Sequence, residues 1–155
     1  MKERFKNIEL GLVGFFITAF TLKLLHIDVA DKILMISGLI LAFFYLFMGI
    51  SASGRMNTIQ VLEADTDLSM RDSKFFLIAG ISLSISIVGI IYYFFHWEGN
   101  EMMLGIGTIS GVFCILLGYV SLRTTHPALF QFLFGRLLPI SVMAGVCYFQ
   151  TLGKL

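Results

Sequence analysis

Four long apolar runs dominate this sequence and exclude most folds. They cover 8–25, 33–50, 75–95 and 102–120, and the only carboxylate among them is Glu9, at the extreme start of the first run. A helix needs about 20 mostly apolar residues to cross the hydrocarbon core of a bilayer. A chain in lipid must also satisfy its backbone polar groups internally, which helices do. The sequence therefore predicts an all-α integral membrane protein, with the first run retained as a span.

The composition supports the same class. Hydrophobic residues make up 57% of the 155 residues and charged residues 14%, whereas soluble domains have about 45–50% and about 25%. The net charge of +1 does not supply the basic face that a nucleic-acid partner needs. Cys114 and Cys147 lie inside apolar runs and outside any CxxC motif, so we interpret both as packing residues.

The last apolar segment supplies a fifth helix, but Arg136 and Pro139 interrupt it. In one solution, 128–135 lies at the membrane interface and a shorter span follows over 137–152. In the other, one tilted helix covers 128–149 and Arg136 is buried and paired. Because an arginine inside the membrane is costly, we predict the first solution. The chain then has four to five spans.

The connections between the runs alternate in length. Those at 26–32 and 96–101 are very short, so the helices they join must form antiparallel hairpins. The connection over 51–74 is longer and polar. In it we expect a short surface helix over 56–62 and a turn capped by Asp65 or Asp67.

Basic residues predict the orientation of the chain in the membrane. Few lie on the side of the tight hairpins, where Lys32 and Lys154 are expected. We therefore predict a cytoplasmic N-terminus, hairpin tips on the outer side and, with five spans, an outer C-terminus. The basic residues expected on the cytoplasmic side are Lys2, Arg4, Lys6, Arg55, Arg71, Lys74 and Arg123.

Shifting the chain by seventy positions aligns an internal repeat. The units are 4–51 and 74–121, followed by the C-terminal hydrophobic segment 128–152. Each unit carries a His-x-acid-x-x-acid pattern at its hairpin tip, beginning at His26 and His96. Because each unit has two spans, both units share one orientation. This is a parallel repeat, unlike the inverted repeats of many transporters.

Polar residues near the tips are the candidate functional residues. Lys23 and His26 are three positions apart, a spacing that places two residues on one helix face. They form either a proton-responsive or partner-binding pair, or a snorkelling lysine beside a histidine among lipid headgroups. Trp97 follows His96 and is typical of an interfacial aromatic belt, with ligand binding as the alternative.

The tips also contain residue types that bind divalent metals. Their spacing matches no strong motif, and acidic residues at a helix start are favoured by the helix dipole alone. No GxSxG, HExxH or phosphate-binding glycine loop occurs. We therefore predict no enzymatic activity, no metal and no cofactor. The residues concerned are His26, Asp28, Asp31, His96, Glu98 and Glu101.

Small residues mark the expected helix contacts. Gly107 and Gly111 form a small-xxx-small pattern, which allows two helices to approach closely in a membrane. Gly80 and Ser84 lie in another small-residue stretch. We predict packing surfaces within the chain or with another subunit.

The hairpin tips resemble those of the GldL family, which supplies a membrane subunit of the gliding-motility and type IX secretion motor of Bacteroidota. Lys23-Leu-Leu-His26 corresponds to the family's Lys-x-x-His, and 96–104 (His-Trp-Glu-Gly-Asn-Glu-Met-Met-Leu) to its turn. The resemblance implies a location in the bacterial inner membrane, periplasmic hairpin tips and other membrane subunits as partners.

The chain departs from the family pattern in ways that bear on function. The family has a glutamate in the second helix that supports proton-driven rotation, but neither 33–50 nor 102–120 contains a carboxylate. Tyr93 stands where the first hairpin has Lys23, and a fifth apolar segment stands where the family has a cytoplasmic tail.

Three functions remain open from the sequence. We expect a non-enzymatic membrane subunit or scaffold, accessory to an energised envelope machine, whose partners are the bilayer and other subunits or a second copy. The alternative is a small transporter or channel with Lys23, His26 and Arg136 in its pathway. A third hypothesis is a membrane enzyme or redox protein that uses the histidines at the tips.

Overall fold

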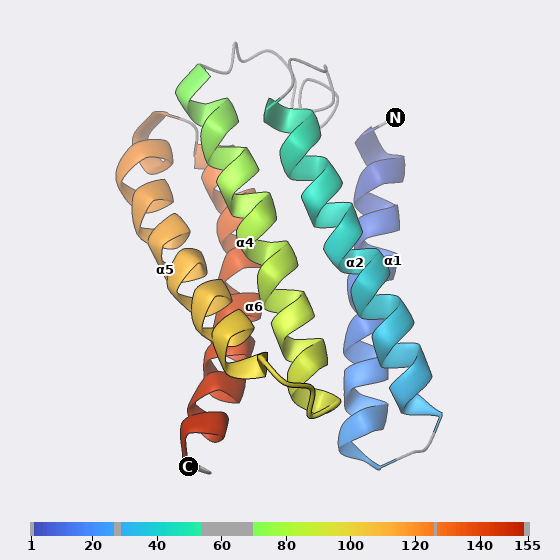
Figure 1. The fold of residues 1–155 in the computed structure, drawn as a ribbon. Helices are drawn as coiled ribbons and strands as arrows, with labels where there is room; N and C mark the ends of the chain where they lie inside the picture. Colours follow the sequence, from blue (N-terminus) through green and yellow to red (C-terminus); the bar gives the residue numbers. More distant parts are fainter. Residues whose placement is uncertain (1, 27–28, 54–69, 126, 154–155) are drawn as a thin grey trace.

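The computed structural model describes residues 2–26, 29–53, 70–125 and 127–153, and within them the protein is helical without strands. Successive helices run antiparallel, so both tight connections and the C-terminal end of the bundle lie at one end, opposite the N-terminus (Figure 1). This confirms the predicted all-α architecture. The helices are α1 (Lys2–Leu24), α2 (Ala30–Ser53), α4 (Met70–Phe94), α5 (Asn100–Thr125) and α6 (Pro127–Leu152).

Four of these helices are long and apolar enough to cross a membrane, over 30–51 in α2, 74–94 in α4, 100–120 in α5 and 133–152 in α6. The crossing of the bilayer by α1 stays a prediction. The surface helix predicted over 56–62 and the turn cap at Asp65 or Asp67 lie outside the described residues. So do most of the basic side chains that predict the orientation.

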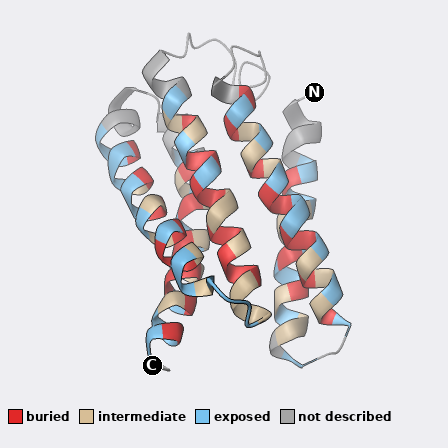
Figure 2. Ribbon diagram, in the orientation of Figure 1, coloured by how far each residue is buried: buried red, intermediate tan, exposed pale blue. Residues whose placement is uncertain are grey.

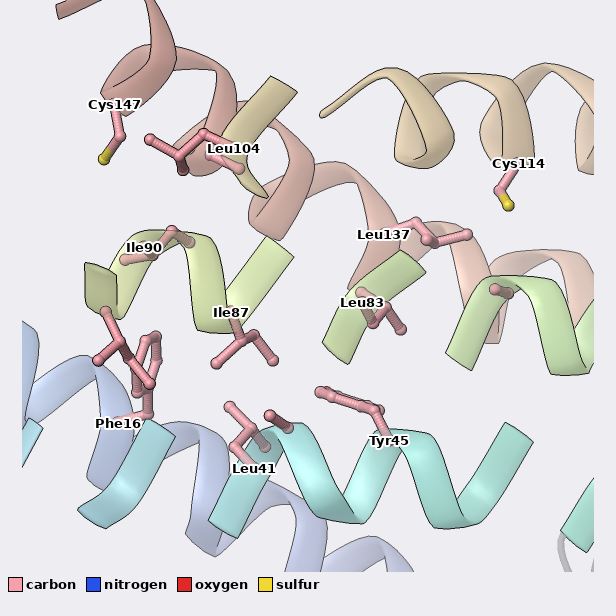
Figure 3. Packing of buried hydrophobic residues seen from close by; sticks show 14 of the residues in the cluster. Phe16, Leu41, Tyr45, Leu83, Ile87, Ile90, Leu104, Cys114, Leu137 and Cys147 are labelled. Atoms are coloured by element: carbon pink, nitrogen blue, oxygen red, sulfur yellow. The ribbon is translucent and has the colours of Figure 1, made fainter. Parts of the chain in front are cut away.

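The centre of the bundle is α4, which packs against α2, α5 and α6. Tyr45 and Leu41 of α2 point toward Leu83 and Ile87 of α4 (Figure 3). Exposed residues follow the outer sides of α2 and α5 (Figure 2). The bundle therefore has one apolar core, and large apolar side chains remain for contact with lipid.

The two hairpin tips share the positions of their helix ends and a left-handed histidine. The helices that enter them end at Leu24 and Phe94, seventy positions apart, and the helices that leave them begin at Ala30 and Asn100, with the same offset. At each tip the second residue after the helix is a histidine, and it is left-handed, with φ of 56° at His26. Histidine is among the non-glycine residues that tolerate this region best.

The second tip shows how the left-handed residue ends its helix. With φ of 52°, His96 donates its N–H to the carbonyl of Tyr93 at 3.2 Å, and Trp97 donates to that of Tyr92 at 3.0 Å. These two bonds form a Schellman cap, which satisfies carbonyls at a helix C-terminus. As predicted, an acidic residue occupies the first turn of the next helix at both tips, namely Asp31 in α2 and Glu101 in α5.

Candidate functional site

The predicted break in the last segment was wrong, because α6 is one helix, as in the alternative solution with a paired Arg136. A position of 128–135 at the membrane interface stays a prediction. Pro139 lies inside it, and since proline has no N–H, the carbonyl of Gly135 loses its helical donor. Proline is tolerated in membrane helices. The helix continues through Arg136 because this residue has a partner that the prediction did not assign to it.

That partner is Glu9 of α1. The Arg136 guanidinium donates from Nε to Glu9 Oε1 and from Nη2 to Glu9 Oε2, which makes a two-pronged ion pair. The Glu9 side chain is 6% exposed and that of Arg136 is 19% exposed. Tyr45 of α2 donates its hydroxyl to Glu9 Oε1 at 3.3 Å. Three helices thus place a carboxylate, a guanidinium and a phenol in one buried polar group.

The pairing explains how two charges are tolerated among apolar helices. A buried charge without a partner is strongly unfavourable, whereas a two-pronged arginine–carboxylate pair is short, oriented and strong. Counting about 1.5 Å per helical residue, Glu9, Tyr45 and Arg136 all lie about 10–14 Å from the helix ends on the N-terminal side of the bundle. The three side chains therefore meet at one level of the bundle.

The polar group also joins two helices that do not pack together. Among the described residues, α1 packs its backbone against α2, while α6 packs against α4 and α5. The long side chains of Glu9 and Arg136 span the separation between α1 and α6. The ion pair therefore ties the first helix to the last.

Sequence reasoning treated Glu9 only as a residue at the start of a run and missed its role. A usable signal was present. The first run holds one carboxylate, Glu9, and the last apolar segment holds one basic residue, Arg136. Two opposite charges in two different apolar segments favour pairing, because a charge inside the membrane is costly unless it is paired.

Lys23 lies at the other end of α1, about 21 Å along the helix from Glu9. Its ammonium forms an ion pair with Asp31 Oδ1 of α2, and the side chains are 24% and 43% exposed. The ammonium is also 6.0 Å from the centre of the Phe95 ring. Lys23 therefore joins the two helices of the first hairpin near its tip.

The predicted shared face of Lys23 and His26 was wrong, because α1 ends at Leu24 and His26 adopts the left-handed conformation beyond it. The His26 side chain is exposed. The three residues of the predicted pathway are thus separated, with Lys23 and His26 at the tip end and Arg136 toward the N-terminal end.

His96 and Trp97 are exposed at the second tip. The Trp97 ring packs on Tyr92, with centroids 4.9 Å apart, and on Phe95 at 5.4 Å. This cluster fits an interfacial aromatic belt. Within the part of the chain that the structure describes, no group of three or more histidine, cysteine or acidic side chains comes together.

The predicted packing glycines lie at close helix approaches. A Cβ on Gly80 would lie 2.6 Å from the Tyr45 carbonyl oxygen and 2.8 Å from the Gly49 Cα, so α2 and α4 touch backbone to backbone. A Cβ on Gly107 would lie 2.8 Å from the Ser86 Cα of α4, and one on Gly111 would overlap Ser141 of α6.

The predicted serine differs from the serines at the interface. Ser84 is only half-buried, whereas Ser82 and Ser86, two positions away on either side, are buried. The Ser82 and Ser110 hydroxyls lie 2.9 Å apart and join α4 to α5.

No protein-family model, curated protein or solved structure matches this chain.

Proposed function

We propose that this chain is a non-enzymatic membrane subunit that packs against a helix of another subunit, or of a second copy, through the outer face of α1. The observation that supports the proposal is a strip of small and polar residues on α1. This strip is exposed, because no other described helix of the chain covers that face of α1. The strip consists of Asn7, Gly11, Gly14, Thr18 and Thr21.

The strip has the spacing and surface of a helix-packing face. Its members recur every three or four positions, which places them on one side of a helix. A Cβ on Gly11 or Gly14 would meet no atom within 4 Å. The Thr18 and Thr21 hydroxyls donate to the carbonyls of Gly14 at 2.8 Å and Ile17 at 2.9 Å. The face is therefore shallow, and its hydroxyl groups are already hydrogen-bonded.

The exposed face of α5 has a different chemistry. It carries large apolar side chains, including Ile109, Phe113 and Leu116, which suit contact with lipid tails. In a bilayer, helix association depends on close packing, and small residues let backbones approach. The α1 strip is suited to another helix, while the α5 face is suited to lipid.

Co-purification tests this proposal. We expect a partner chain, or a second copy, to remain with the protein after extraction in a mild detergent. Gly11→Leu and Gly14→Leu together should remove it while the chain still accumulates. Val112→Leu on the α5 face is the matched control and should keep it. A solitary monomer in every mild detergent would contradict the proposal.

We further propose a bacterial inner-membrane location, periplasmic hairpin tips and an accessory role in an envelope machine. The GldL-like tips support this extension. The carboxylate that the chain does carry between its helices, Glu9, is neutralised by Arg136. That arrangement favours an accessory role over proton-driven rotation. Identifying co-purifying proteins from native membranes tests it, and partners unrelated to any envelope machine would count against it.

A transporter or channel is the second candidate, and the buried group of Glu9, Tyr45 and Arg136 favours it. Polar groups inside a membrane often mark a substrate or ion pathway. The separation of Lys23 and His26 from Arg136 does not favour a continuous path through all three. A flux assay in proteoliposomes with the parent protein, Tyr45→Phe, and Lys23→Ala with His26→Ala distinguishes the two candidates. Flux that depends on Tyr45 would support transport through the buried group, and no flux of any ion or small solute would count against transport.

A further inference from the structure

We propose that the hydroxyl groups of Ser82, Ser110 and Ser141 form a buried site for a water molecule, at the place where α4, α5 and α6 meet. Each of these helices supplies one of the three hydroxyls. The inference does not depend on a partner subunit, because all three side chains belong to this chain.

The first reason is that the Ser141 hydroxyl has no hydrogen-bond partner in the protein, although protein encloses it. Ser141 is 5% exposed, and its Oγ is a buried atom without a hydrogen bond. A serine in a helix can donate to the carbonyl four positions earlier, as Ser86 does to that of Ser82 at 2.9 Å, but Ser141 does not. A buried hydroxyl without a partner is unfavourable, and an ordered water supplies the missing bond at such positions.

The second reason is that the other two hydroxyls gather around the same place. A Cβ on Gly111 of α5 would overlap Ser141 Oγ and lie 3.6 Å from Ser82 Oγ. Ser82 Oγ in turn lies 2.9 Å from Ser110 Oγ. A buried water makes about three hydrogen bonds, and a hydroxyl can both donate and accept. The three serines therefore supply the partners that one water needs.

The third reason concerns charge, which favours a neutral ligand over a cation. The membrane spans of α4, α5 and α6 contain one acidic residue, Glu101. It lies about 14 Å along α5 from Ser110. The carboxylate of Glu9 on α1 is paired with Arg136. A cation among the serines would have no counter-charge, which is costly inside a membrane, whereas water needs none.

Magnetisation transfer from water in solid-state NMR tests the site, with the protein in bilayers and its serines isotope-labelled. Ser37 is the matched control, because it is fully buried in α2 and its hydroxyl already donates to the carbonyl of Leu34 at 3.2 Å. We expect transfer to the Cβ of Ser141 to be several-fold stronger than transfer to that of Ser37. Equal transfer to the two residues would overturn the proposal.

Two variants test whether Ser141 holds the water. In Ser141→Ala, transfer to Ser82 should fall toward the level of Ser37, because the water loses one of its hydrogen bonds. In Ser37→Ala, transfer to Ser82 should not change. Unchanged transfer to Ser82 in Ser141→Ala would contradict the site. If that variant accumulates poorly, the comparison of Ser141 with Ser37 in the parent protein is decisive.

Exchanging the ions of the buffer distinguishes water from a cation. Replacing sodium and potassium by choline should leave the transfer to Ser141 and its chemical shift unchanged. A chemical shift at Ser141 that depends on the small cations would show a cation site and overturn the proposal.

Discussion

The two hairpins share their helix ends and a left-handed histidine but differ in how their two helices meet. In the second hairpin, α4 and α5 are in close backbone contact, with Gly107 against Ser86 and Gly89 against Leu104. In the first hairpin, Lys23 of α1 is paired with Asp31 of α2 near the tip, and Glu9 of α1 is paired with Arg136 of α6 toward the other end. The helix α1 therefore depends on charged contacts in a way that α4 does not.

Aligning the two repeat units at their offset of seventy positions shows which residues make the two hairpins different. Ala79, fully buried, stands where the first hairpin has Glu9, and Tyr93 stands where it has Lys23. Gly107 corresponds to Ser37. An alanine or glycine lets a neighbouring helix approach, whereas a charged side chain bridges a larger separation. In the structure, α4 packs on α2, α5 and α6, while α1 packs on α2 and is joined to α6 by the ion pair.

The largest effect is expected from breaking the ionic attachment. Arg136→Leu leaves Glu9 buried without its charge partner, and loss of one member of a buried pair typically costs about 3–5 kcal/mol. Unfolding by SDS in mixed micelles measures the change. The double variant Glu9→Leu, Arg136→Leu should recover most of the stability. A double variant as unstable as the single one would show that the charges are not what holds α1.

The next effect concerns the close attachment of the second hairpin. Gly107→Ala places a Cβ 2.8 Å from the Ser86 Cα, and overpacking a tight contact costs about 1–3 kcal/mol. Gly135→Ala is the matched control, because its Cβ would meet open space. Thermal unfolding in detergent measures both. If the two variants lost the same stability, the contact between α4 and α5 would not be the cause.

A smaller effect is expected at Tyr45. Tyr45→Phe removes the hydroxyl that donates to Glu9 but keeps the aromatic ring in the core. Because Arg136 still satisfies Glu9, we expect a loss of about 0.5–1.5 kcal/mol. SDS unfolding measures it. In the Glu9→Leu, Arg136→Leu double variant, Tyr45→Phe should lower the stability by less. If it lowered the stability by the same amount, the effect would come from packing and not from the hydrogen bond to Glu9.

The smallest effect is expected at the tip of the first hairpin. Lys23 and Asp31 are partly exposed, so solvent and salt screen their attraction, and such pairs contribute about 0–1 kcal/mol. Lys23→Met keeps the length of the side chain and removes the charge. A loss in SDS unfolding comparable to that of Arg136→Leu would show that the tip pair is not screened by solvent as we infer.

Apolar length was enough to predict the helices because it is a local property of the sequence. The predicted run 33–50 lies inside α2, and 102–120 lies inside α5. The matching tips were also visible, since His26 and His96 stand at the same offset as the helix ends. A row of alternating serines at 82, 84 and 86 does not reveal which of them face α5, and the structure buries Ser82 and Ser86 but leaves Ser84 half-buried.

The sequence by itself determined that the chain forms apolar helices and where the tight turns between them fall. Tertiary structure alone decided that α6 is one helix, because the charge that stabilises Arg136 comes from a residue 127 positions away. The local sequence shows that burying Arg136 would be unfavourable, but it does not show that Glu9 offsets this cost. Glu9 comes close to Arg136 only when α1 and α6 pack around the same core. The physical reason is that a buried charge is stabilised by whatever lies beside it in space, and proximity in space is a property of the fold.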